Sequence, residues 1–295
     1  MTEIFGVPTV ALYGQLLLGL INGSFYGILS LGLAIIFGLL KITNFAHGAQ
    51  YMLGAFAAWM LLNYAGLGYW WALVLAPLAV GALSIGLERF LISRIYGLDP
   101  VYGLLLTFGI ALVLQGIFKN YYGSTGMPYN VPPQLTGATD LGFMVLPNYR
   151  AWVVAVSLTT CLATWFVIEK TKLGVYVRAS TENAALTKCF GIPVPRLITL
   201  TYGFGGALAA FAGVLAGPIY AVNPLMGADL VVVVFAVVVI GGMGSIMGSV
   251  LTGYVLGIIE SLTKVFYPQG SVTVIFVIMG LVLLVRPAGL FGKSQ

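Results

Sequence analysis

The chain has 295 residues, of which 60% are hydrophobic and 7% are charged. A soluble globular domain carries about 25% charged residues, so this composition excludes a water-soluble domain as well as a disordered or collagenous chain. The net charge of +5 is small for this length and does not indicate nucleic-acid binding. A single histidine and two cysteines are too few for a zinc site, a haem site or a disulfide framework.

Charged residues are absent from long stretches of the sequence, and these stretches predict membrane-spanning helices. Uncharged apolar runs separate Glu3 from Lys41 and Arg196 from Asp229, for example. About 20 residues at a rise of 1.5 Å cover the hydrocarbon core of a bilayer, which is ~30 Å thick. We therefore expect an all-α, polytopic transmembrane helix bundle that forms one domain over residues 1–295.

Turn-forming residues divide the apolar runs into about nine predicted spans, within a range of eight to ten. The spans cover residues 11–38, 46–63, 70–92, 101–119, 150–169, 197–217, 228–241, 246–262 and 270–285. The segment 228–241 would be only about 21 Å long as a helix. It is therefore either a short crossing or a broken, re-entrant segment.

The distribution of Lys and Arg predicts which ends of the spans face the cytoplasm. If the loop 170–196 is cytoplasmic and all nine segments cross, ten of the thirteen basic residues lie on the cytoplasmic side, as the positive-inside rule requires. This arrangement places the N-terminus outside and the C-terminus in the cytoplasm. The loop 121–149 is then external. Because it is poor in charge and rich in glycine and proline, we expect either a lid at the membrane surface or a docking surface for an external protein.

The cytoplasmic loop 170–196 contains a predicted helix of about ten residues. Ser180 is a candidate N-cap, and Gly191 with the following Pro193 suits the end of a helix. Three side chains with the spacing i, i+3, i+4 share one face of this helix, namely Leu186, Cys189 and Phe190. This apolar face either packs on the underside of the protein or docks into a partner.

Sequence motifs for energy conversion and for catalysis are absent. The chain has no phosphate-binding G-x-x-x-x-G-K-[ST] loop, no G-x-S-x-G elbow and no pair of carboxylates within a span. Glu88 and Glu260 lie near predicted span ends, which favours structural pairing over proton transport. A stand-alone channel or secondary carrier would need a buried ionisable pair or a charged pore ring, and a membrane-embedded enzyme would need clustered histidines or carboxylates.

Polar residues within or at the ends of the spans are candidates to line a translocation path. They are Asn22, Asn44, His47, Thr107 and Gln115. For the stretch 44–50 the sequence is compatible with two interpretations. In one, Asn44 caps the second span and backbone satisfies His47. In the other, a broken segment brings Asn44, His47 and Gln50 together at a gate.

Glycine accounts for 39 residues, many of them inside apolar runs. Gly19, Gly23 and Gly27 recur every four residues, a spacing that allows close helix packing in lipid. A second group consists of Gly241, Gly242, Gly244 and Gly248. Three glycines in four residues interrupt a helix. This second group is therefore a cytoplasmic turn, or a break at membrane depth that is buried or lines a cavity, with close packing as its alternative role.

Several motifs occur in an order that resembles a known family. They are the segments 19–26, 32–38 and 44–48, Arg178-Ala179-x-x-Glu182 with Ala185 and Gly191-Ile192, the glycine run 241–248, and 286–292. Over about residues 12–293 the chain resembles the permease subunit of bacterial branched-chain amino-acid ABC importers. Permeases for urea and short amides are similar, so the resemblance is less specific for the substrate.

The resemblance implies partners that supply what this chain lacks. It implies a second, related permease subunit in the inner membrane, two cytoplasmic ATPase subunits that use ATP and Mg, and a periplasmic substrate-binding protein. The chain itself would bind no cofactor and no metal. The segment 178–192 matches the family's ATPase-coupling segment, whose residues here are Arg178, Ala179, Glu182, Asn183, Ala185, Leu186, Cys189, Phe190, Gly191 and Ile192.

Two positions depart from the family pattern. Asn183 stands where the family often has Asp, and Ala49 where it often has Glu, so the roles of those carboxylates do not carry over. With these exceptions the resemblance implies an alternating-access permease for branched-chain amino acids. The alternatives are the same architecture carrying urea or short amides, and a stand-alone channel or carrier.

Overall fold

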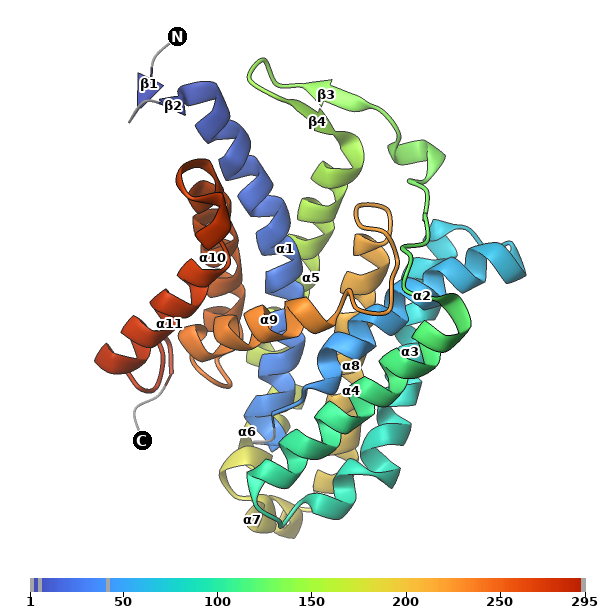
Figure 1. The fold of residues 1–295 in the computed structure, drawn as a ribbon. Helices are drawn as coiled ribbons and strands as arrows, with labels where there is room; N and C mark the ends of the chain where they lie inside the picture. The colour runs from blue at the N-terminus through green and yellow to red at the C-terminus, as the bar shows by residue number, and fades with distance from the viewer. Residues whose placement is uncertain (1–2, 5–6, 41–42, 293–295) are drawn as a thin grey trace.

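Helices make up most of the chain in the computed structural model, which describes residues 3–4, 7–40 and 43–292 (Figure 1). The α-helices in these residues are α1 (Thr9–Leu40), α2 (Ala46–Ala65), α3 (Tyr69–Phe90), α4 (Pro100–Tyr122), α5 (Asn148–Lys170), α6 (Lys172–Glu182), α7 (Ala184–Cys189), α8 (Val194–Ala216), α9 (Ala228–Gly241), α10 (Ile246–Phe266) and α11 (Thr273–Val285). Short 3-10 turns are η1 (Ile92–Ile95), η2 (Pro133–Leu135) and η3 (Pro268–Gly270). Each of the nine predicted spans coincides with one helix, so the predicted helix bundle is confirmed.

Six helices are both long and apolar enough to cross a bilayer, namely α1, α3, α4, α5, α8 and α10. The helix α2 has 20 residues but carries polar side chains such as His47 and Gln50. The helices α9 and α11 have 14 and 13 residues, and they are each about 20 Å long, shorter than a ~30 Å hydrocarbon core. A polytopic helical membrane protein is therefore supported, whereas nine crossings and the sides of the termini stay predictions. Lys41 and Lys293, which contributed to the side assignment, lie outside the described residues.

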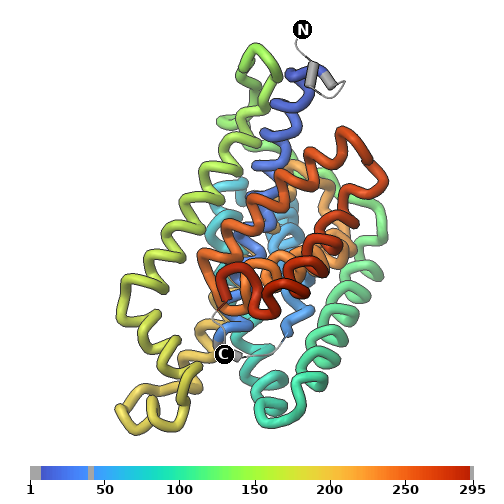
Figure 2. The backbone as a smooth tube through the Cα atoms, turned by 90° about the vertical axis from the view of Figure 1, so that its left-hand side faces the viewer, coloured from blue at the N-terminus to red at the C-terminus, as the bar shows by residue number. Residues whose placement is uncertain are grey.

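The helix α1 lies at the centre of the bundle, where it contacts α5, α8, α9 and α10. In its most apolar stretch 83% of the residues are buried, compared with 22% in α4 and 28% in α5. Figure 2 shows α4 and α5 on opposite flanks of the molecule. A helix that is apolar all round belongs in the interior, whereas the outer faces of α4 and α5 are available to lipid or to another subunit.

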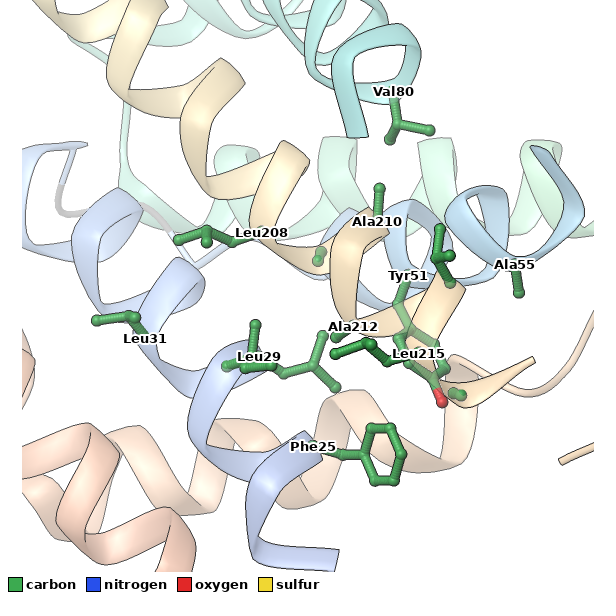
Figure 3. Close-up of a cluster of buried hydrophobic side chains, with 14 of the residues drawn as sticks. Phe25, Leu29, Leu31, Tyr51, Ala55, Val80, Leu208, Ala210, Ala212 and Leu215 are labelled. Atoms are coloured by element: carbon green, nitrogen blue, oxygen red, sulfur yellow. The ribbon is translucent and has the colours of Figure 1, made fainter. Parts of the chain in front are cut away.

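The main core forms where α1, α2 and α8 meet. Figure 3 shows Phe25 and Leu29 of α1 beside Tyr51 of α2 and beside Ala212 and Leu215 of α8, and all five are buried. Many core positions of α8 are alanine or glycine. Small residues let the helix backbones approach closely, which is how helices associate where hydrophobicity gives no advantage over lipid.

Glycines bring α1 and α10 into backbone contact. A Cβ on Gly257 of α10 would lie 2.5 Å from the Cα of Gly23, and one on Gly19 would lie 2.6 Å from the Cα of Ile258. Both distances are shorter than any carbon–carbon contact that packing tolerates. The predicted close packing of Gly19 and Gly23 is therefore confirmed.

Two small antiparallel strand pairs, which the sequence did not predict, accompany the helices. Strand β1 (Glu3–Ile4) pairs with β2 (Val7–Pro8), and β3 (Ala138–Asp140) pairs with β4 (Val145–Pro147), with Ala138 opposite Pro147. The second pair belongs to the loop 121–149. In the same loop Met127 exchanges backbone hydrogen bonds of 2.8 and 3.0 Å with Val222. This part of the loop therefore packs over the α8–α9 connection.

Candidate coupling segment and translocation path

The predicted cytoplasmic helix is divided at Asn183 into α6 and α7. The predicted cap at Ser180 is wrong, because Ser180 lies inside α6 and its hydroxyl donates to the carbonyl of Tyr176 at 2.7 Å. Asn183 instead has extended backbone, and its Oδ1 accepts a hydrogen bond from the backbone N–H of Leu186 at 2.9 Å. Two facts explain this difference. Asn is as good an N-cap as Ser, and Ser180 cannot begin a helix because α6 has already begun at Lys172.

The end of α7 follows the sequence prediction. Gly191 has a φ of +78°, a left-handed conformation that glycine adopts without strain. Its N–H donates to the carbonyl of Lys188 at 2.9 Å. Pro193 then begins the next helix, α8, by occupying its N-cap position.

The predicted apolar face of α7 is uncovered within the described part of the chain. The side chains of Leu186 and Phe190 are 55% and 77% exposed, and Cys189 is exposed beside them. Thr187, which lies about 100° round the helix from Leu186, is buried. Figure 1 shows α6 and α7 at the end of the molecule opposite to the β3–β4 hairpin. An exposed apolar face on a segment outside the bundle is typical of a docking site.

The helix α6 connects α7 to the bundle. Arg178 donates from Nη1 to the carbonyl of Ile168 at 2.8 Å and forms an ion pair of 3.3 Å with Glu169, both at the end of α5. The two charged side chains are nearly half exposed, so the ion pair itself contributes at most about 1 kcal/mol. Of the predicted coupling residues, Arg178 thus holds α6 in place, whereas Glu182 and Ala185 are exposed beside the apolar face.

A cavity of about 650 Å³ lies between the end of α3 and the α7–α8 connection. Its wall includes Glu88, a buried carboxylate that accepts hydrogen bonds from the hydroxyls of Tyr96 and, at 2.6 Å, Thr199. Burial and the hydrogen bond to Glu88 raise the pKa of Tyr96, which keeps its hydroxyl protonated as the donor. Glu88 is thus bound by hydroxyl partners, one just after η1 and one on α8, and it forms no ion pair with the described residues. The α7 segment therefore borders a contact between α3 and α8.

Asn44 and His47 lie buried at the start of α2. Asn44 Oδ1 accepts hydrogen bonds from the N–H of Ala46 at 3.1 Å and from the hydroxyl of Tyr202 at 3.2 Å. His47 Nε2 lies 3.0 Å from the carbonyl oxygen of Leu29. The backbone partner expected of His47 is thus present, whereas the N-cap position of α2 is occupied by Phe45 rather than by Asn44, whose side chain instead accepts from the first N–H of the helix.

The same turn of α2 also carries polar atoms without partners. Gln50 donates from Nε2 to Ser84 Oγ at 3.0 Å. Within the described chain, Asn44 Nδ2, His47 Nδ1 and Gln50 Oε1 are buried and make no hydrogen bond. Such atoms are rare and cost about 1–3 kcal/mol each. Three of them in neighbouring turns favour a functional role for this cluster, which we call the α2 polar cluster (Asn44, His47 and Gln50).

The two predicted path residues of α4 differ in their surroundings. The hydroxyl of Thr107 accepts from the N–H of Phe45 at 3.1 Å and lies 3.0 Å from the carbonyl of Thr43, so it holds α4 against the connection that leads into α2. Gln115 is partly exposed and makes no hydrogen bond within the described residues. The structure therefore brings Thr107, but not Gln115, to the α2 polar cluster.

The glycine run separates α9 from α10. Gly242 and Gly244 have φ values of +100° and +86°, which break the helix. A Cβ on Gly248 would lie 2.3 Å from the carbonyl oxygen of Gly241, so these two glycines provide close packing. The N–H of Leu290 donates to the carbonyl of Ile240 at 2.8 Å, and the C-terminal segment thereby covers the break.

A second cavity, of about 310 Å³, lies among α1, α2, α9, α10 and the α8–α9 connection. Glu260 in its wall is buried; its Oε2 accepts from the hydroxyl of Tyr26 at 2.6 Å, and its Oε1 pairs with Lys264 at 2.7 Å. Of the predicted path residues, Asn22 lines this cavity, where it accepts from the hydroxyl of Tyr220 at 3.3 Å. Burial raises the pKa of Tyr220, so this hydroxyl stays protonated.

Most residues of this cavity were not among the sequence candidates. The sequence indicates Glu260 only as a carboxylate at a span boundary, and it does not single out Tyr26, Asp229 or Lys264 as site residues. The i, i+4 spacing of Glu260 and Lys264 in an otherwise uncharged helix was the available signal. Nothing in the sequence indicated that Asp229, more than 30 positions away, would line the same cavity.

Comparison with known proteins identifies similar chains over nearly the full length. A family model described as branched-chain amino acid transport system / permease component matches residues 15–285. The permease proteins LivH of Escherichia coli K12 and BraD of Pseudomonas aeruginosa, both of high-affinity branched-chain amino acid transport systems, are 30% and 31% identical to the chain. Each alignment covers 95% of this chain and 96% of the relative. LivM of Escherichia coli K12, a permease protein of the same type of system, is 29% identical over 92% of this chain and 68% of its own.

Proposed function

The chain belongs to the family of branched-chain amino acid transport permease components, and on this basis we propose that it is the membrane-spanning subunit of an ATP-driven importer. Its substrates are branched-chain, aliphatic amino acids, which it moves into the cytoplasm by alternating access. The observation that carries the proposal is the full-length match to the permeases LivH and BraD. The chain is not itself an enzyme, and ATP and Mg are used by its partners.

The α7 face is the proposed contact with an ATPase subunit. Leu186 and Phe190 present apolar surface to the outside, while Arg178 holds the preceding helix against α5. A docking helix has to transmit movement to the bundle. A short connection joins α7 to α8, and the first turns of α8 contact α3 through the hydrogen bond between Thr199 and Glu88. Closure of two ATPase subunits would therefore move the end of α8 and, through it, the α2 polar cluster.

A second permease subunit and a periplasmic binding protein complete the proposed assembly. The matches to both LivH and LivM support a pair of related permeases. Less than a third of the most apolar stretch of α3, α4 and α5 is buried, which leaves apolar surface for lipid and for a partner. The proposed location is the bacterial inner membrane, with the α6–α7 segment in the cytoplasm and the loop 121–149 facing the binding protein.

The α2 polar cluster is the proposed gate of the translocation path. Its partnerless atoms are buried between α1, α3 and α8, so a small shift of α8 changes which of them are hydrogen-bonded. The glycine break between α9 and α10 supplies a second place where the backbone can bend. Neither feature requires this chain to carry out bond chemistry.

Transport of radiolabelled leucine by the reconstituted complex tests the proposal. The chain is co-purified with its co-encoded partners and placed in proteoliposomes, with and without internal ATP and the binding protein. We expect uptake that requires both and that isoleucine and valine, but not urea, reduce by competition. Competition by urea would support the amide alternative. ATP-independent uptake by this chain alone would show a channel or carrier.

A further inference from the structure

The cavity among α1, α2, α9 and α10 has charges of both signs in its wall. It is lined by Asn22, Phe25, Tyr26, Tyr51, Tyr220, Asn223, Met226, Asp229, Leu230, Glu260 and Lys264. Its volume of about 310 Å³ is at the lower end of the range for small-molecule sites, roughly 300–1,000 Å³. A space of this size suits one amino acid and excludes a peptide.

Glu260 holds the ammonium group of Lys264 in place, but this ion pair does not occupy all of the ammonium's hydrogen-bond donors. It pairs with Glu260, whose second oxygen is taken by Tyr26, so Glu260 has both oxygens engaged and fixes the lysine. An ammonium has three N–H donors, and the Lys264 side chain is 40% exposed. Donors therefore remain for a carboxylate that enters the cavity.

Asp229 provides a free carboxylate in the same wall. It lies in the first turn of α9, is exposed, and makes no hydrogen bond or ion pair with any described residue. The charged groups of the wall are thus one bound ion pair, Glu260 with Lys264, and one negative charge without a counter-charge. A ligand with an ammonium group supplies that counter-charge, whereas urea or a neutral amide does not.

A tyrosine hydroxyl and an apolar wall complete the cavity. Tyr51 is 1% exposed, and its hydroxyl has no hydrogen-bond partner among the described residues. Figure 3 shows this hydroxyl pointing toward Phe25. Phe25, Met226 and Leu230 provide the apolar surface, which suits an aliphatic side chain.

We propose that this cavity is a substrate subsite for a zwitterionic aliphatic amino acid. Asp229 binds the α-ammonium group, Lys264, held by Glu260, binds the α-carboxylate, and Phe25 and Leu230 contact the side chain. The proposal rests on the proposed import function and adds to it the place where the permease itself holds the substrate.

Substitutions at Asp229 test the subsite, because this exposed side chain has no structural partner to lose. The variants are Asp229→Asn, Asp229→Lys and the charge-conserving Asp229→Glu, each in the complete importer in proteoliposomes. Asp99→Asn, at an exposed acidic position before α4 where Asn caps a helix as well as Asp does, is the matched control. Both leucine uptake and ATP hydrolysis are measured with saturating, leucine-loaded binding protein, and the result is leucine taken up per ATP hydrolysed.

We expect the ratio to fall about tenfold in Asp229→Asn, the loss of one charge-assisted hydrogen bond, and further in Asp229→Lys. The ratio should stay near the unsubstituted value in the control Asp99→Asn, and Asp229→Glu, which keeps the charge, should lose less than Asp229→Asn, while ATP hydrolysis persists in all of them. An unchanged ratio in Asp229→Asn and Asp229→Lys would overturn the subsite. Absence of leucine uptake by the unsubstituted complex would instead refute the import function, so the two failures are distinguishable.

Discussion

Replacement of Gly257 by alanine tests the packing that holds α1 against α10. A Cβ at this position would lie 2.5 Å from both the Cα and the N of Gly23, and 2.7 Å from the carbonyl oxygen of Gly19. Carbon atoms pack at about 3.5–4.0 Å, so the two helices have to separate by about 1 Å. All three neighbouring atoms are backbone, and no side-chain rotation can relieve the contact.

The expected loss of stability in Gly257→Ala is the difference between two opposing effects on the free energy of unfolding. Overpacking costs about 1–3 kcal/mol, and the backbone neighbours place Gly257→Ala at the upper end. Alanine is favoured over glycine inside a helix by about 0.5–1 kcal/mol, which offsets part of that cost. The expected net destabilisation is therefore about 2 kcal/mol. It also displaces Glu260 and Lys264, which follow on the same helix.

The assay is the thermal midpoint of the detergent-solubilised protein, measured as the fraction that stays monodisperse in size-exclusion chromatography. Gly116→Ala is the matched control, because a Cβ on Gly116 in α4 meets nothing within 4 Å. We expect the midpoint to fall for Gly257→Ala and to stay or rise for Gly116→Ala. Equal or higher stability of Gly257→Ala than of the control would refute the backbone-to-backbone packing of α1 and α10.

Three further predictions concern the coupling segment and the buried carboxylate. Phe190→Asp should reduce capture of the ATPase subunits about tenfold or more, because it places a charge on the docking face. Tyr121→Asp, which changes an equally exposed aromatic residue at the end of α4, should leave capture unchanged. Intact capture by Phe190→Asp would show that the ATPase subunits do not bind this face of α7. Asn183→Ala should destabilise α7 by about 0.5–2 kcal/mol through loss of its N-cap, and hydrogen exchange of the α7 backbone amides should become faster. Asn183→Asp keeps the cap and should keep exchange slow. Equal exchange rates in the two variants would contradict the capping role. Glu260→Gln should lower the free energy of unfolding by about 1–3 kcal/mol, because it removes the negative charge from the hydrogen bond with Tyr26 and from the partly exposed ion pair with Lys264. Glu169→Gln, at a surface ion pair, should change the free energy of unfolding by less than about 1 kcal/mol. Similar effects at the two positions would argue against a buried role for Glu260.

The positions of the helices were predictable because they depend on local properties of the chain. A backbone in lipid has to satisfy its hydrogen bonds within the segment, so every long uncharged run becomes a helix and every cluster of turn-forming residues ends one. The four-residue spacing of Gly19 and Gly23 likewise predicted close packing, and Gly191 together with Pro193 predicted the end of α7. Errors arose where neighbouring residues offered equivalent choices, as with Ser180 and Asn183, both of which are good N-caps.

The candidate sites were less predictable because they combine residues that are distant in sequence. The sequence singled out Asn44, His47 and Thr107, and the structure brings them together at the start of α2. It did not predict that Asn22, Asp229 and Lys264 line one cavity, since their proximity depends on how α1, α9 and α10 pack. Gln115 shows the reverse case, because this polar residue of a span makes no hydrogen bond with any described residue.

From the sequence alone, the chain is a helical membrane protein with a short apolar-faced helix between two spans and without a motif for an ATP-binding loop. Composition, charge spacing and turn residues suffice for this, because each acts over a few neighbouring positions. Only the tertiary structure decides that the free carboxylate of Asp229 and the paired ammonium of Lys264 face the same small cavity. The physical reason is that electrostatic complementarity depends on distance in space, and that distance is set by the glycine contacts between helices rather than by spacing along the chain.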